Sequence, residues 1–135
     1  MILVDTNVLI DILADDPLWG DWSSEQLRLA LEAGAVAIND VIYAELASRC
    51  SSIEQTDDLL RQLRLEREAL TNAALFMAGK AFVQYRRAGG TRTGVLPDFF
   101  IGAQAAVLGA TLLTRDAPRY RTYFPSVEIV APEVG

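Results

Sequence analysis

Four acidic residues stand at positions where acids are not expected. Asp5 directly follows the apolar run Ile2–Val4, and Asp116 comes shortly after another apolar run. Asp98 opens an almost wholly apolar stretch, and Glu45 lies among apolar residues of a predicted helix. Burying unpaired carboxylates is costly, so such groups need a cation or must stay protonated. Mg²⁺ and Mn²⁺, hard ions that prefer oxygen ligands, would meet that need.

The residue types missing from the chain narrow the possible chemistry. It contains no histidine, which excludes histidine-based triads, zinc motifs and imidazole acid–base catalysis. The single cysteine, Cys50, permits neither an internal disulfide nor a zinc cluster by itself, and it fits a reducing cytoplasm. Any catalysis must therefore depend on carboxylates, hydroxyls, arginine or lysine.

Each of the four acids also has a plain structural explanation. Asp5 could be a turn residue at a strand end, and Asp98 and Asp116 could cap helices. Glu45 falls inside the apolar arc of its helix at ~100° per residue, yet it could reach water or pair with an arginine. Because all four occur together without any histidine, we favour a shared metal site.

Length and charge indicate one globular domain with a polarised surface. The chain has 135 residues and a net charge of −6. Residues 1–68 hold 14 acids and 5 bases, whereas residues 69–135 hold 4 acids and 7 bases. The basic half could face a phosphate backbone, although a solvated helix side would produce the same pattern. We expect no membrane span and no signal peptide, because no apolar run approaches ~18–20 residues and the amino terminus lacks a basic start.

Short apolar segments alternate with helical patterns along the whole chain. Strands are expected at residues 2–4, 35–38, within 65–70, 110–113 and 127–130. Helices are expected at residues 6–14, from Ser23 or Ser24 to about Gly34, from Asn39 or Asp40 through Glu45, at 53–64, from Thr71 or Asn72 to Ala88, and at 98–108 after a loop at 91–97. The strands lack internal alternation of polar and apolar residues, which predicts an α/β fold with a buried parallel sheet. Asp5 and Asp116 would then lie at the carboxyl ends of strands, where open parallel sheets bind ligands.

The ordered set of acids resembles the pattern of PIN-domain proteins, and most closely that of the VapC toxins of toxin–antitoxin pairs. The resemblance covers nearly the whole chain. The motifs that carry it are Asp5-Thr6-Asn7, Glu45, Leu96-Pro97-Asp98, the run Phe99-Phe100-Ile101-Gly102-Ala103-Gln104-Ala105, Thr114-Arg115-Asp116, and the tail Tyr120…Tyr123-Phe124-Pro125…Ile129.

This resemblance implies a fold, a reaction and partners. The fold is a single PIN domain over residues 1–135, with a five-stranded parallel sheet of order 3-2-1-4-5 and helices on both faces. The reaction is Mg²⁺- or Mn²⁺-dependent hydrolysis of RNA phosphodiester bonds by an endoribonuclease. The partners are a second copy in a homodimer and a cognate VapB-type antitoxin.

Individual residues receive roles on the same basis. Asp5 and Asp98 would bind the metal most directly, and Asp116 and Glu45 would act directly or through water. Thr6, Asn7 and Thr114 could hydrogen-bond these ligands or the substrate, although stabilising a local turn would explain each equally well. The predicted RNA-phosphate contacts are Arg86, Arg87, Arg92 and Arg115, and a dimer or antitoxin surface could include Phe76, Met77 and Phe82.

Three other functions compete with a toxin. A haloacid-dehalogenase-like phosphatase normally requires a second acid at the position where this chain has Asn7. It also requires a later lysine, whereas the only lysine of this chain, Lys80, lies within a predicted helix. A housekeeping RNA-processing nuclease and a degenerate PIN domain that only binds partners are the other two. Transfer, ribosomal and messenger RNA all remain open as targets.

Overall fold

The computed structural model describes residues 1–92 and 94–132. Within them lie five strands, all parallel, which form one sheet of order β3-β2-β1-β4-β5. The strands are β1 (Ile2–Val4), β2 (Val36–Asn39), β3 (Glu66–Glu68), β4 (Thr111–Leu113) and β5 (Ile129–Val130). The predicted fold class and strand order are confirmed. β5 is shorter than predicted because the Val127 amide turns back to the Phe124 carbonyl, at 3.0 Å.

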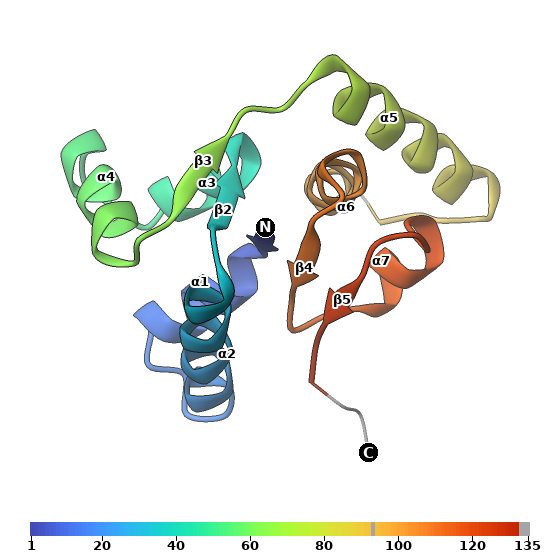
Figure 1. The fold of residues 1–135 in the computed structure, drawn as a ribbon. Coiled ribbons are helices and arrows are strands. Elements are labelled where there is room, and N and C mark those ends of the chain that lie inside the picture. Colours follow the sequence, from blue (N-terminus) through green and yellow to red (C-terminus); the bar gives the residue numbers. More distant parts are fainter. Residues whose placement is uncertain (93, 133–135) are drawn as a thin grey trace.

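Seven helices connect and cover these strands in the described residues. They are α1 (Thr6–Leu13), α2 (Gly20–Ala33), α3 (Asp40–Ala47), α4 (Ile53–Gln62), α5 (Asn72–Arg87), α6 (Leu96–Leu108) and α7 (Pro118–Tyr123). Figure 1 shows α1 and α2 on one side of the sheet and α5 and α6 on the other. The sheet is therefore covered on both faces, as its continuously apolar strands require.

The start of α2 differs from the prediction. Neither Ser23 nor Ser24 caps the helix, which begins at Gly20 after Trp19 without a side-chain cap. The carboxylate of Asp16 accepts the Trp19 amide at 2.7 Å and so holds the preceding turn. The Ser23 hydroxyl is buried and donates instead to Asp11, at 2.9 Å. The Ser23 hydroxyl therefore bonds to a residue of another helix and does not provide the cap of α2 that the local sequence pattern predicts.

Two other helix starts follow ordinary capping chemistry. The Asn39 side chain caps α3 by accepting the Ile42 amide at 3.0 Å, and Thr71 caps α5. Helix α6 begins at Leu96, inside the predicted loop at residues 91–97, of which residue 93 lies outside the described residues. Proline in the first turn explains this start, since the first-turn amides of a helix lack intrahelical partners.

Helix α6 lies in the interior, as its apolar sequence predicts. Gln104, its buried polar residue, donates to the carbonyls of Glu68 at 3.3 Å and Ala69 at 3.0 Å, at the end of β3. Gly102 permits close packing, because a Cβ there would lie 2.4 Å from the Phe124 ring. These contacts fix α6 against the sheet and so determine where its first turn, with Asp98, is placed.

Candidate active site at the carboxyl edge of the sheet

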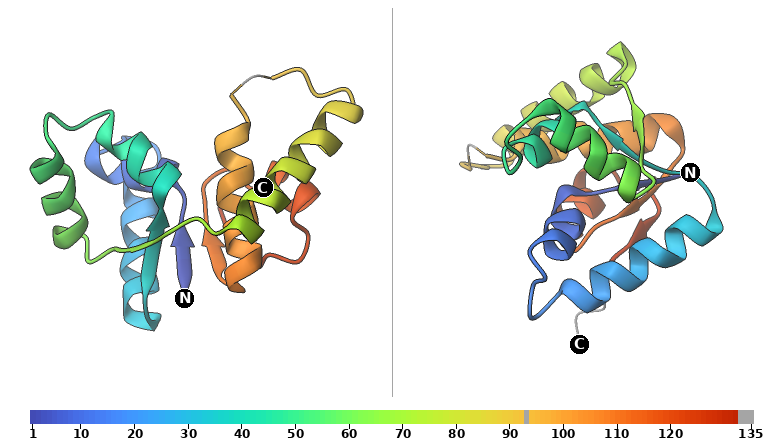
Figure 2. Two further views of the ribbon diagram at one scale, coloured as in Figure 1. Left: turned by 90° about the horizontal axis from the view of Figure 1, so that it is seen from above. Right: turned by 90° about the vertical axis from the view of Figure 1, so that its left-hand side faces the viewer.

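The central strands β1 and β4 bring two of the predicted acids to one edge of the sheet. They are adjacent and parallel, and the Asp5 amide donates to the Leu113 carbonyl at 2.8 Å, which extends their pairing. Asp116 follows β4 by three residues. The chain runs to opposite sides from β1 and β4, so this edge is the switch point at which α/β sheets bind ligands. Helix α6 also starts toward this edge (Figure 2, left), which brings in Asp98.

The carboxylate of Asp5 is buried and receives four hydrogen bonds from neutral donors. One oxygen accepts the Thr6 amide at 2.7 Å, which also makes Asp5 the N-cap of α1. The other oxygen accepts the Thr114 hydroxyl at 2.8 Å and the Tyr120 hydroxyl at 2.9 Å. The Asn7 amide group lies 3.4 Å from this second oxygen. Four donors orient the carboxylate, but none of them carries a positive charge.

The loop after β4 is held to α1 through the predicted polar residues. The side-chain oxygen of Asn7 accepts the Arg115 amide at 3.1 Å. The Thr114 hydroxyl accepts the Asp116 amide at 3.1 Å while it donates to Asp5. Asn7 and Thr114 thus tie the segment that carries Asp116 to the segment that carries Asp5.

The remaining two acids have partners of different kinds. Glu45, on α3, accepts the Thr6 hydroxyl at 2.8 Å. Asp98, in the first turn of α6, accepts Nη1 of Arg119 at 2.5 Å and does not cap its own helix. Asp116 is exposed, and α7 begins after Ala117 without any side-chain cap. The alternative that Asp98 and Asp116 serve as caps is therefore wrong.

The pKa values indicate that the acids interact. Burial is the main cause that raises the pKa of Asp5 to about 6, and the charge of Asp98 raises it further. Burial also raises the pKa of Asp98, with a contribution from Asp116, whereas Arg119 lowers it. The pKa of the buried Tyr120 hydroxyl is raised by burial first, then by Asp5, Asp98 and Glu45. Tyr120 thus lies within the field of three of the four acids.

The four acids suit a hard divalent ion, because they offer carboxylate oxygens and come from segments that meet at one edge of the sheet. Within residues 1–92 and 94–132, however, no three Asp, Glu, Cys or His side chains are arranged as a metal site. The Asp98 carboxylate is turned to Arg119, and that of Glu45 to Thr6. Binding an ion at three or more of these carboxylates therefore requires side chains to rearrange from the positions that they have in this structure.

The predicted phosphate contacts fall into two groups. Arg86 and Arg87 end α5, and Arg92 follows in the loop that leads to α6, so these exposed side chains lie near the same end of α6 as Asp98. Arg115 is different, because its guanidinium binds the buried Asp11 carboxylate through Nε at 2.8 Å and Nη2 at 3.1 Å.

Three residues that contact this network were not among the predicted site residues. They are Tyr120, which binds Asp5; Arg119, which binds Asp98; and Asp11, which binds Arg115. Asp11 is an acid within an apolar helix, and this is the same sequence signal that identifies Glu45. Tyr120 and Arg119 gave no such local signal, since their partners lie far away in the sequence.

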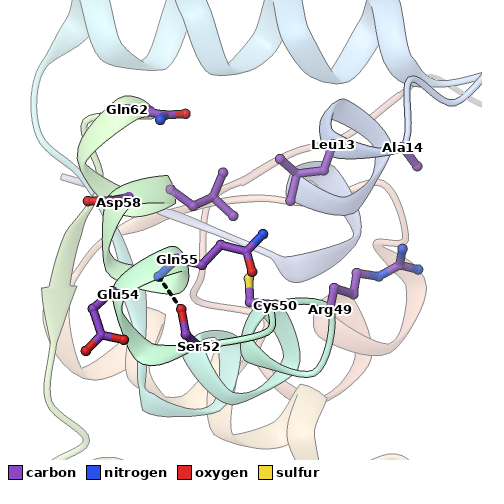
Figure 3. Close-up of a pocket in the computed structure, with 10 residues that line it drawn as sticks. Leu13, Ala14, Arg49, Cys50, Ser52, Glu54, Gln55, Asp58 and Gln62 are labelled. Atoms are coloured by element: carbon purple, nitrogen blue, oxygen red, sulfur yellow. Dashed lines mark hydrogen bonds between the residues drawn. The ribbon is translucent and has the colours of Figure 1, made fainter.

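A hollow of about 660 Å³ lies elsewhere, between the end of α1 and α4 (Figure 3). Its lining includes Leu13, Leu59, Arg49 and Asp58, and none of the four acids. The candidate site is therefore defined by its charged groups at the sheet edge, not by this hollow.

Comparison with known proteins identifies the family of this chain. The family model of the PIN domain matches residues 2–125, so the chain belongs to the PIN-domain family. PIN domains are typically nucleases that use divalent metal ions. Comparison with curated protein sequences gave no significant match.

Solved structures share the fold at low sequence identity. VapBC2 from Rickettsia felis, bound to a promoter DNA fragment, superposes with a TM-score of 0.72 at 23% identity, over 97% of this chain and 98% of that chain. VapBC-1 from nontypeable Haemophilus influenzae gives 0.72 at 18%, with the same two coverages. A toxin–antitoxin complex from Klebsiella pneumoniae gives 0.68 at 21%, over 96% of each chain.

Proposed function

We propose that this PIN domain is a divalent-metal-dependent endoribonuclease and the toxin of a toxin–antitoxin pair. The observation that carries the catalytic part is the buried Asp5 carboxylate, which has neutral donors only and lies in the field of Asp98. A buried charge without a counter-ion is costly, and a bound cation removes that cost. Asp5, Glu45, Asp98 and Asp116 are the proposed ligands of Mg²⁺ or Mn²⁺.

The residues of the chain would bind, orient and transfer protons. Asp5 is oriented by Thr6, Asn7 and Thr114. Its oxygen that accepts only the Thr6 amide keeps a free lone pair, which can face an ion without a change of side-chain conformation. A bound divalent ion supplies Lewis-acid polarisation of a phosphate oxygen and lowers the pKa of bound water. Asp116, the most exposed of the four acids, is open to solvent and so suited to accept a proton from the attacking water.

RNA would be held beside this site by basic side chains. Arg86, Arg87 and Arg92 are exposed at the turn between α5 and α6, where they can neutralise phosphates without first giving up a buried ion pair. We keep Arg115 as a weaker candidate for a phosphate contact, since its guanidinium would have to bind Asp11 and a phosphate at the same time.

The described residues contain no helix that is long and apolar enough to cross a membrane.

The toxin role rests on similarity to VapBC assemblies. The fold that this chain shares with them favours a VapB-type antitoxin as its partner. We expect the toxin to form a homodimer and to act in the cytoplasm. Phe76 and Met77 on α5 are 68% and 38% exposed and would contribute to such an interface, whereas Phe82 is largely packed against Phe99. A housekeeping RNA-processing nuclease would use the same site without an antitoxin.

Metal removal and one isosteric substitution test the catalytic part. Purified protein should cleave RNA with Mg²⁺ or Mn²⁺ and stop when EDTA is added, because the carboxylates alone cannot activate water. Asp98→Asn should remove cleavage, whereas the matched change Asp21→Asn, at an exposed position in α2, should leave it intact. Cleavage that persists in EDTA would contradict the metal mechanism. An acid-stable aspartyl-phosphate adduct would favour the phosphatase alternative instead.

Expression in bacteria tests the biological role. Growth should stop on induction and resume when the product of a small neighbouring gene is co-expressed. Cleavage in vitro without any growth arrest would favour a housekeeping nuclease. Tight binding to a partner with neither cleavage nor metal binding would favour a degenerate PIN domain.

A further inference from the structure

Arg119 is the basic side chain that lies against the proposed metal ligands. Its Nη1 atom is 2.5 Å from an Asp98 oxygen, and the two side chains are 23% and 33% exposed. Among the ion pairs of the described residues, this is the one that involves any of the four acids. A guanidinium therefore sits where positive charge is needed.

The short helix α7 contacts both acids that are proposed as direct ligands. Arg119 and Tyr120 are consecutive residues, and they donate to Asp98 and Asp5 respectively. Tyr120 is neutral and buried, so it can keep its bond to Asp5 when an ion binds. Arg119 is charged and partly exposed, so a second cation close to Asp98 would repel it.

We propose that Arg119 is an exchangeable counter-ion: it neutralises Asp98 in the metal-free protein and is displaced when a divalent ion binds. This inference rests on the proposed metal site. It gives one reason why no three acids of the described residues are arranged as a metal site, since Asp98 is held toward the arginine. Two cations that compete for one carboxylate weaken each other's binding by the same factor.

Calorimetry of Mn²⁺ binding without RNA tests the competition. Arg119→Gln removes the competing charge, so the Mn²⁺ dissociation constant should fall by roughly five- to tenfold. Arg119→Lys keeps a positive charge and should therefore bind Mn²⁺ more weakly than Arg119→Gln does. Arg121→Gln, an exposed arginine two residues further along α7, is the matched control and should change nothing. Unchanged or weaker binding by Arg119→Gln would overturn the proposal.

A measurement on the unaltered protein covers the case in which Arg119→Gln fails to fold. The Nε–H resonance of Arg119 should shift on titration with Mg²⁺, in parallel with metal binding, while that of Arg121 stays in place. An Arg119 resonance that is constant at saturating Mg²⁺ would refute displacement. If the unaltered protein binds Mn²⁺ and Asp98→Asn does not, the proposed site stands whatever Arg119 does; if neither binds, the site and this inference both fail.

Discussion

Two buried aspartates at helix α1 have opposite electrostatic surroundings. Asp5 is 5% exposed and Asp11 is 2% exposed. Asp11 receives two bonds from the Arg115 guanidinium and one from the Ser23 hydroxyl, so its charge is compensated. Asp5 receives bonds from neutral groups only, and its pKa rises to about 6.

The difference separates a structural carboxylate from a candidate ligand. A buried acid with a bidentate arginine has its hydrogen bonds and its charge satisfied within the chain. A buried acid that has donors but no counter-charge is oriented and yet remains costly, which is the condition that a metal ion relieves. Burial alone does not distinguish the two aspartates, and the charge of the partner does.

The largest expected effect is on catalysis at Asp5. Asp5→Asn should lower RNA cleavage on the order of 10³-fold, because the amide keeps the shape of the carboxylate but not its charge. The measurement is single-turnover cleavage at saturating Mg²⁺, with circular dichroism to confirm folding. Full activity in a folded Asp5→Asn protein would remove Asp5 from the site.

The pH dependence of stability should also expose the uncompensated charge of Asp5. Since the pKa of Asp5 is about 6 in the folded protein and 3.8 ordinarily, the folded state binds the extra proton between these values. The resulting stabilisation is complete below pH 3.8 and is lost as the pH rises through 6, by at most ~3 kcal/mol. The measurement is urea unfolding in EDTA at several pH values, and the quantity compared is the difference in free energy of unfolding between the unaltered protein and Asp5→Asn. A flat difference from about pH 4 to 7 would argue against a perturbed Asp5.

A smaller effect, on stability and not on chemistry, is expected at Asp11. Asp11→Asn leaves Arg115 without its carboxylate and should lower the free energy of unfolding by about 2 kcal/mol, a value reduced because Arg115 is one-third exposed. Cleavage per folded molecule should change little. Should Asp11→Asn abolish cleavage in folded protein, the contrast between the two aspartates would be lost.

The smallest effect concerns the exposed arginines. Arg86→Ala in an Asp5→Asn background, which binds RNA without cutting it, should flatten the salt dependence of RNA binding by about 0.7 in the log–log slope. Arg28→Ala is the control, because this arginine pairs with Glu25 and Glu32 on α2. Equal slopes for Arg86→Ala and the parent would remove Arg86 from the RNA contact surface.

Much of the fold could be predicted because its determinants are local. The apolar run Ile2–Val4, the capping residues Asn39 and Thr71, and the apolar stretch of α6 each specify an element through neighbours only a few positions away. The predictions failed where a residue bonds to a distant partner. The hydroxyl of Ser23, for example, donates to Asp11 and does not cap α2.

The amino-acid sequence by itself determined the elements, their alternation and the four acids that they carry to the ends of strands and helices. Only the tertiary structure decided which carboxylate has a counter-ion. Asp11 meets Arg115 across 104 positions, Asp5 meets Tyr120 across 115, and Asp98 meets Arg119 across 21. Such pairings depend on how strands and helices pack, because electrostatic energy follows distance in space and not separation along the chain.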